Sequence, residues 1–192
     1  MARHEFYTTF EISQICGVNP TTVQNWVKGK KLRAFQTPGG HRRVRREDLV
    51  AFLREFGMPV PEDLSQGPPL VLIVDDESDI LEMLEALMRS GEDDVRVAKA
   101  RSGVDALLMI GETKPDLLIL DILMPGMNGY EVCRKLKASP GTQNIRIVAI
   151  SGDHDAGVKE RVLGAGADLF FTKPLEIVSF REQCFNLLQL QT

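Results

Sequence analysis

Polar side chains directly follow four short apolar runs in the second half of this 192-residue sequence. They are Asp75 and Asp76 after 70–74, Asp121 after 117–120, Ser151 after 145–150, and Thr172 and Lys173 after 167–171. A single polar residue after a strand is usually a helix cap or turn residue. Because such residues occur at the ends of four runs, a shared site is favoured instead. The negative charges of neighbouring carboxylates in that site would raise the pKa of each carboxyl group. A hard divalent cation relieves that conflict, and Mg²⁺ suits a site of few carboxylates plus water and phosphate.

These residue types together suit phosphoryl transfer. Asp121 is the expected nucleophile, because a carboxylate can form an acyl phosphate. Mg²⁺ and Lys173 would neutralise the phosphoryl oxygens, since this chemistry depends mainly on positioning and charge stabilisation. The Ser151 hydroxyl can donate a hydrogen bond to a phosphoryl oxygen.

Five strand–helix units must position these side chains. Helical patterns near 78–90, 102–111, 129–138, 156–165 and 176–189 alternate with apolar runs at 70–74, 95–98, 117–120, 145–150 and 167–171. The first and third runs are continuously apolar, as in central strands, whereas 94–99 alternates polar with apolar residues, as in an edge strand. We predict an α/β, flavodoxin-like, doubly wound five-stranded parallel sheet of order 2-1-3-4-5. Ligands bind such sheets at the carboxyl ends of the strands, where the strand order reverses.

Residues 70–190 resemble the receiver domain of bacterial two-component response regulators. The matching segments are Val-Leu-Ile-Val-Asp-Asp at 71–76, Asp-Ile-Leu-Met-Pro-Gly-Met-Asn-Gly at 121–129, Ala-Ile-Ser-Gly at 149–152 and Phe-Thr-Lys-Pro at 171–174. The resemblance implies that Asp121 is the phosphoacceptor and that a histidine kinase or phosphotransfer protein is the donor. It implies Mg²⁺ bound by Asp75, Asp76, Asp121 and the Leu123 backbone carbonyl.

The same resemblance implies a switch. Ser151 and Lys173 would contact the phosphoryl group, Ser151 would move inward, and Phe170, three residues before the lysine, would rotate. A core aromatic at a strand end fits Phe170 equally well. The Lys173–Pro174 bond is expected to be cis. A homodimer through this domain is a further possibility.

The chain divides near 57–69, where four prolines and two glycines indicate a linker between domains at 1–56 and 70–192. Residues 1–56 hold ten Lys and Arg against five Asp and Glu, a balance of +5. The totals of 23 and 27 then leave 13 basic and 22 acidic side chains elsewhere, a balance of −9. A basic first domain suggests nucleic acid as its partner.

A helix-turn-helix is predicted in this basic domain. Thr8 or Thr9 can cap a helix that runs through Ile15, and 16–19 form the turn. Asn19 and Pro20 then start a second helix at about 20–29. That helix would expose a set of side chains able to contact duplex DNA in the major groove: Thr21, Thr22, Gln24, Asn25 and Lys28.

A hairpin-like wing is predicted at 32–44, with its turn at 38–40. A cluster of basic side chains follows that turn and would neutralise phosphates: His41, Arg42, Arg43, Arg45 and Arg46. A third helix is expected at 47–56. This domain resembles the winged helix-turn-helix of MerR and excisionase-type proteins, in which Gly-His-Arg-Arg (here 40–43) is followed by Asp-Leu (48–49). The long dimerising helix usual in that family is missing, which leaves the oligomeric state open.

Composition restricts the functional classes. No apolar run approaches the roughly 18 residues of a membrane span, the first residues lack a signal-peptide core, and three scattered cysteines favour neither disulfides nor zinc. We therefore expect a cytoplasmic protein without a membrane partner. A phosphatase of the haloacid dehalogenase type is disfavoured. Such enzymes have a second Asp two residues after the nucleophile, and this chain has Leu123 at that position. We predict a response regulator, not an enzyme, that controls transcription through double-stranded DNA. The alternative is a phosphorelay adaptor whose helix-turn-helix binds a protein.

Overall fold

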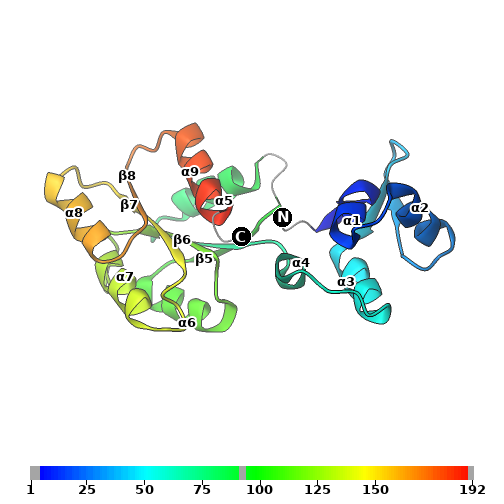
Figure 1. The fold of residues 1–192 in the computed structure, drawn as a ribbon. Coiled ribbons are helices and arrows are strands. Elements are labelled where there is room, and N and C mark those ends of the chain that lie inside the picture. Colours follow the sequence, from blue (N-terminus) through cyan, green and yellow to red (C-terminus); the bar gives the residue numbers. More distant parts are fainter. Residues whose placement is uncertain (1–4, 91–93, 190–192) are drawn as a thin grey trace. The chain divides into compact units, whose positions relative to one another are not determined.

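The computed structural model describes residues 5–90 and 94–189, and the chain forms two compact units, one up to Pro68 and one from Pro69 (Figure 1). The first unit has one buried cluster of apolar side chains, and the second unit has two. Within the described residues, no helix is both long and apolar enough to cross a bilayer.

The second unit contains a five-stranded parallel sheet in the order β5-β4-β6-β7-β8. Its strands are β4 (Leu70–Val74), β5 (Arg96–Ala100), β6 (Leu117–Asp121), β7 (Arg146–Ser151) and β8 (Leu169–Thr172). The helices are α5 (Ser78–Arg89), α6 (Gly103–Thr113), α7 (Gly129–Ala138), α8 (Ala156–Gly164) and α9 (Ile177–Gln189). When the five strands are numbered in the order in which they occur along the chain, their order across the sheet is 2-1-3-4-5. The predicted doubly wound fold is therefore confirmed.

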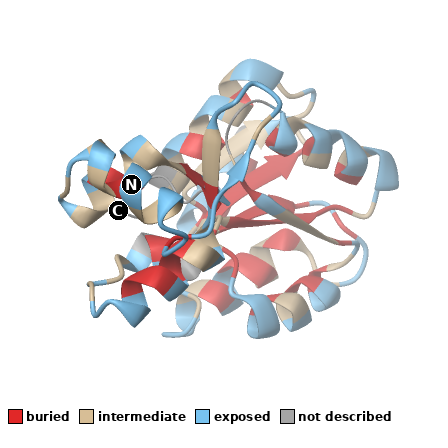
Figure 2. Cartoon of the chain, turned by 90° about the vertical axis from the view of Figure 1, so that its right-hand side faces the viewer, coloured by how far each residue is buried: buried red, intermediate tan, exposed pale blue. Residues whose placement is uncertain are grey.

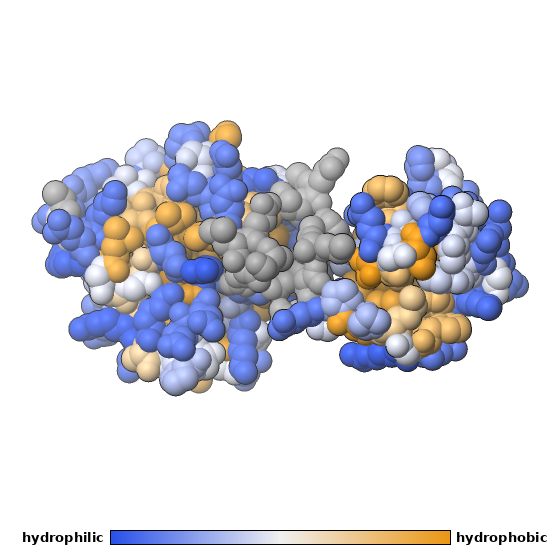
Figure 3. All heavy atoms as spheres, in the orientation of Figure 1, coloured by the Kyte–Doolittle hydropathy of each residue, from blue (hydrophilic) through white to orange (hydrophobic). Residues whose placement is uncertain are grey.

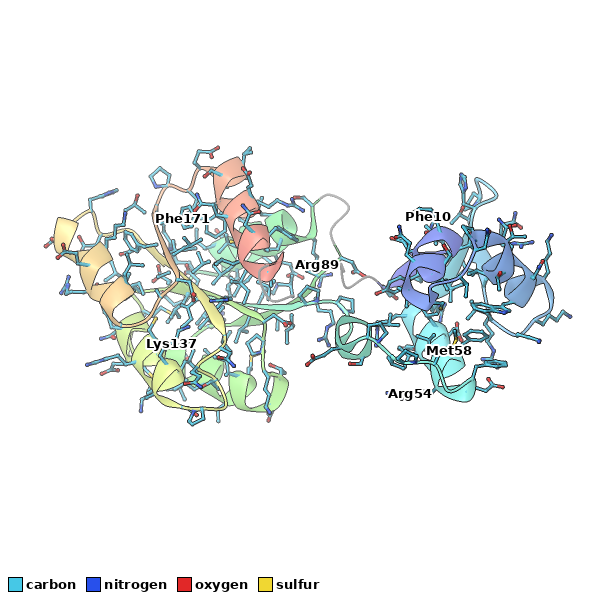
Figure 4. All side chains as sticks on the ribbon, in the orientation of Figure 1. Phe10, Arg54, Met58, Arg89, Lys137 and Phe171 are labelled. Carbon is cyan, nitrogen blue, oxygen red and sulfur yellow. The ribbon has the colours of Figure 1, made fainter. Side chains whose placement is uncertain are left out.

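Two interior strands of this sheet, β4 and β6, are buried along their whole length. Every residue of β4 and β6 is buried, because helices cover both faces of the sheet (Figure 2). Leu72 and Val74 belong to the core beneath α6, α7 and α8, whereas Val71 and Ile73 belong to the core beneath α5 and α9. Phe171 of β8 lies against α9, with its ring centroid 4.9 Å from that of Phe180 (Figure 4). Continuous apolar runs therefore mark strands that are packed on both faces.

The first unit combines helices with a small antiparallel sheet of order β1-β3-β2. Its elements are β1 (Phe6–Thr8), α1 (Thr9–Cys16), α2 (Pro20–Lys28), β2 (Phe35–Gln36), β3 (Arg42–Arg45), α3 (Arg46–Glu55) and α4 (Glu62–Gln66). The wing is the β2–β3 hairpin, in which the Gly40 N–H donates to the Thr37 carbonyl at 2.8 Å.

Local capping defines the two helices of the predicted helix-turn-helix. Thr8 caps α1 in a reciprocal box, since the Glu11 N–H donates to its hydroxyl at 3.1 Å and its own N–H donates to the Glu11 carboxylate at 2.7 Å. Asn19 caps α2 by accepting from the Thr21 N–H at 3.1 Å, with Pro20 at the first helical position. The predicted helix starts are thus confirmed.

Two expectations for this unit need correction. The sequence pattern predicts no strand ahead of the first helix, but Phe6–Thr8 form a strand that pairs with β3. The linker expected at 57–69 instead contains α4, and its Leu64 is 2% exposed within the core of the first unit. Arg46 holds this segment by donating to the Leu64 carbonyl at 3.2 Å. The prolines thus do not mark an unpacked linker, because apolar side chains between them pack against the core of the first unit.

Candidate functional site

Lys173 joins two buried carboxylates at the carboxyl edge of the second unit's sheet. Its ammonium group donates to Asp75 Oδ2 at 2.8 Å and lies 3.1 Å from Asp121 Oδ1. Asp75 is 1% exposed and Asp121 is 4% exposed, so both charges are removed from bulk water. The structure therefore brings together three of the predicted site residues, which lie as much as 98 positions apart in sequence.

Burial determines how these groups ionise. It raises the pKa of Asp121, against the charge and hydrogen bond of Lys173, and the like charge of Asp75 raises that pKa further. A hydrogen bond from the Leu123 backbone N–H acts in the opposite direction. Burial alone would lower the pKa of Lys173, but its hydrogen bond to Asp75 and the charges of both aspartates raise it overall. Lys173 thus keeps its positive charge, and it lies beside the Asp121 carboxylate, which is poorly shielded by water.

Ser151 and Phe170 occupy the two strands beyond β6. Ser151 is fully buried at the end of β7, and its hydroxyl oxygen accepts from the Asp153 N–H at 3.0 Å. Phe170 on β8 is half-buried, pairs in register with Ala149, and packs against the core beneath α6, α7 and α8. The Lys173–Pro174 bond is cis, as predicted.

Two of the predicted Mg²⁺ ligands, Asp75 and Asp121, meet at this edge, and carboxylate oxygens are donors that Mg²⁺ prefers. Asp75, Asp76 and Asp121 supply three carboxylates against the one ammonium of Lys173, so the group has excess negative charge. Within residues 5–90 and 94–189, no three His, Cys, Asp or Glu side chains are placed to hold a metal ion. Backbone oxygen and water would have to complete the coordination, which is how Mg²⁺ is usually bound. Asp76 is half-buried, and the Leu123 side chain is 55% exposed.

Three residues near the site were not anticipated. Glu77, the third acidic residue after β4, lies 3.9 Å from the Lys173 ammonium. Arg101 follows β5 and donates to the Asp76 backbone carbonyl at 3.3 Å. Gly129 starts α7 so close to the site that a Cβ there would lie 2.7 Å from the Asp121 carbonyl oxygen. The only sequence signal for Glu77 and Arg101 was their position after a strand end, whereas Gly129 is the last residue of the receiver-like segment 121–129.

The predicted DNA-contacting residues of α2 lie mainly on the surface of the first unit. Thr21, Gln24, Asn25 and Lys28 are exposed, but Thr22 is half-buried. Val23 is fully buried and anchors the opposite side of the helix in the core. The helix therefore presents one polar face to solvent.

The wing cluster is divided between two sides of the sheet. His41 is exposed at the turn, and Arg42 follows at the start of β3. Alternation along a strand then places Arg43 and Arg45 on one face, with Val44, which is fully buried, on the other. The basic side chains of this cluster, although close in sequence, thus do not form a single surface.

Two protein families match the chain. The family described as "Response regulator receiver domain" matches residues 71–184, and the family described as "Helix-turn-helix domain" matches residues 6–56. The first match covers more than half of the chain and contains the whole Asp75–Asp121–Lys173 site.

Curated relatives share this second unit. "Response regulator PleD" of Caulobacter vibrioides is 39% identical over 108 residues, 56% of this chain and 23% of that protein. "Transcriptional regulatory protein AfsQ1" of Streptomyces coelicolor is 38% identical over 109 residues, 56% of this chain and 46% of that protein. The matched region is therefore less than half the length of either relative.

Solved structures agree with the fold. The signal receiver domain of a DNA-binding response regulator from Colwellia psychrerythraea 34H has a TM-score of 0.60 at 27% identity, over 63% of this chain and 98% of that one. The signal receiver domain of a signal transduction histidine kinase from Syntrophus aciditrophicus has a TM-score of 0.58 at 33% identity, over 63% of this chain and 90% of that one. This chain therefore belongs to the response regulator receiver domain family, and a helix-turn-helix domain precedes its receiver domain.

Proposed function

We propose that Asp121 accepts a phosphoryl group from a histidine kinase or phosphotransfer protein, and that phosphorylation controls binding of the first unit to double-stranded DNA. The protein would act in the cytoplasm as a transcriptional regulator rather than as an enzyme with its own turnover. The observation that supports this most strongly is the buried Asp121 carboxylate, 3.1 Å from the Lys173 ammonium, in the same chain as a helix-turn-helix.

The transfer step follows from the site's charges. A carboxylate oxygen of Asp121 forms the new bond to phosphorus while the phosphorus–nitrogen bond of a phosphohistidine donor breaks, and the imidazole leaves with that electron pair. Lys173 stabilises the negative phosphoryl oxygens as they approach. Mg²⁺, held by Asp75, Asp76, Asp121 and the Leu123 carbonyl, would supply further neutralising charge when bound.

The output would begin at Ser151. Its hydroxyl accepts from the Asp153 N–H and has a proton available to donate to a phosphoryl oxygen on Asp121. Its movement inward would leave space for Phe170 to rotate. These shifts on β7 and β8 would change homodimerisation through the receiver domain or the freedom of the first unit. The first unit would then bind duplex DNA through the exposed face of α2, with His41 and the wing arginines on phosphates.

The phosphoacceptor is tested with acetyl phosphate, Mg²⁺ and intact-mass measurement of the full chain. We expect one added phosphoryl group on the parent and on Asp79→Asn, a matched change of an exposed carboxylate in α5. We expect none on Asp121→Asn. Phosphorylation of Asp121→Asn to the parent's extent would contradict the assignment.

DNA binding is tested by titrating the full chain onto random duplex pools, with and without Mg²⁺ and beryllofluoride, which mimics the acyl phosphate. We expect salt-dependent binding that beryllofluoride alters by a measurable factor. Lys28→Gln should reduce the salt slope by about 1, as for loss of one phosphate contact. Lys159→Gln, on an exposed lysine of α8, should leave it unchanged. No salt-dependent duplex binding in either state would favour an adaptor whose helix-turn-helix binds a protein.

A further inference from the structure

The sheet of the first unit has an exposed face on which aromatic and cationic side chains alternate. Cross-strand partners lie on the same face of a sheet. Phe6 of β1 is opposite Arg45 of β3, and Phe35 of β2 is opposite Arg43 of β3. We call these four side chains the aromatic–arginine face.

The other face of the sheet is covered by helices. Tyr7 is 3% exposed, Val44 is fully buried, and both belong to a core with Ile12 of α1 and Leu49 of α3. Phe6 and Phe35 therefore point away from the helices, and they are 40% and 41% exposed. The core of the first unit thus does not account for either ring.

The two rings and Arg45 are exposed, and Arg43 is half-buried. The rings meet edge to face, with centroids 5.3 Å apart and planes at 79°, so this contact does not cover both faces of either ring. In the part of the chain that the structure describes, neither Arg43 nor Arg45 forms a salt bridge with a carboxylate; Arg43 donates only to the Arg42 backbone carbonyl, at 3.2 Å. Burial of aromatic surface and pairing of both cations would each favour binding.

We propose that the aromatic–arginine face binds single-stranded nucleic acid, with unpaired bases stacked on Phe6 and Phe35 and phosphates on Arg43 and Arg45. An open sheet with exposed aromatic rings beside positive charge is a general solution for unpaired bases, because every base has a π-face and every nucleotide a phosphate. Bases in a duplex already stack on one another and do not offer these faces. This site goes beyond the proposed duplex binding, because Phe6 and Phe35 take no part in that binding, although the two sites would share Arg43 and Arg45.

The direct test measures fluorescence anisotropy of the full chain with a labelled oligothymidylate of about 12 nucleotides, within the range of known single-strand sites. A strand of equal length made of abasic nucleotides supplies the same phosphates without bases. We expect the parent to bind the oligothymidylate at least about tenfold more tightly than the abasic strand. Phe6→Leu/Phe35→Leu keeps apolar bulk but removes the rings, and should abolish that difference.

One further variant tests the contribution of charge, and another is a control for the loss of an exposed aromatic ring. Arg43→Gln/Arg45→Gln should weaken both strands and reduce the salt slope by about 1.4, as for two phosphate contacts on a single strand. Phe10→Leu, at a 60% exposed aromatic on α1 (Figure 4), is the matched control and should bind as the parent does. Thermal unfolding followed by fluorescence of Trp26, the only tryptophan, checks that each variant is folded.

Equal affinity of the parent for the oligothymidylate and the abasic strand would overturn the proposal, as would undiminished preference in the folded Phe6→Leu/Phe35→Leu variant. Loss of single-strand binding in Lys28→Gln, with no loss in the sheet variants, would place the site on α2 and likewise overturn it. Duplex titrations run in parallel keep this outcome distinct from failure of the proposed DNA binding.

Discussion

Replacing Lys173 by methionine should destabilise the receiver domain more at neutral pH than at acid pH. Methionine keeps most of the length of the lysine side chain but removes the ammonium group that contacts Asp75 at 2.8 Å and Asp121 at 3.1 Å. Both carboxylates would then stand buried, close to one another, without a cation.

The size of the effect follows from burial. Removing one partner of a buried ion pair typically destabilises a protein by about 3–5 kcal/mol, because the remaining charge is left uncompensated. The Lys173 side chain is 22% exposed, so water can reach the vacated position and reduce that loss. We expect the lower value, about 3 kcal/mol, which lowers the Tm of a domain of this size by roughly 10 °C.

The pH dependence follows from the raised pKa of Asp121. Burial already raises that pKa, and loss of Lys173 removes the charge that holds it down. An acid whose pKa is higher in the folded than in the unfolded state destabilises the fold above its folded-state pKa, and this effect disappears as pH falls below its unfolded-state value. The stability difference between Lys173→Met and the parent should therefore be largest near neutral pH and decline towards about pH 4.

Urea unfolding followed by far-UV circular dichroism measures this difference at several pH values. Trp26 lies in the first unit, so its fluorescence transition should remain unchanged. Lys159→Met is the control for loss of an exposed lysine, and Asp121→Asn added to Lys173→Met should restore part of the stability. A loss below about 1 kcal/mol at neutral pH, or one equal at pH 4 and pH 7, would refute this view of buried, uncompensated charge.

Three further predictions concern packing and capping. Leu64→Ala should destabilise the first unit by about 2–4 kcal/mol in urea unfolding followed by Trp26 fluorescence, whereas an unpacked linker residue would give no change. Gly129→Ala should lower the Tm of the receiver domain and slow phosphorylation by acetyl phosphate, because its Cβ would lie 2.7 Å from the Asp121 carbonyl oxygen; unchanged values would contradict the close approach. Thr8→Ala should destabilise the first unit by about 1 kcal/mol through loss of the capping box, and Thr8→Ser should retain most of it.

Periodicity and capping were enough to predict much of the fold. Continuous apolar runs at β4 and β6 indicated strands covered on both faces, and alternation near β5 indicated an edge. Thr8 and Asn19 marked helix starts through their own side-chain oxygens. Such signals are local, because they depend on a residue's nearest neighbours along the chain and on which faces of its element are buried.

The short elements of the first unit could not be predicted in this way. β1 has three residues and becomes a strand only because β3 lies beside it. The five-residue α4 follows a proline-rich stretch, and it is held by Leu64 in a core formed by distant residues. Elements of this length have little intrinsic stability, so tertiary contacts decide them.

The sequence by itself determined which side chains end the strands of the receiver domain, and so which groups were candidates for phosphoryl chemistry. Only the tertiary structure decided that Lys173 contacts Asp75 and Asp121, and that Arg43 and Arg45 share a face with Phe6 and Phe35. The physical reason is range: a strand end depends on its own hydrophobic pattern, whereas a distance between side chains depends on strand register and packing across the whole sheet.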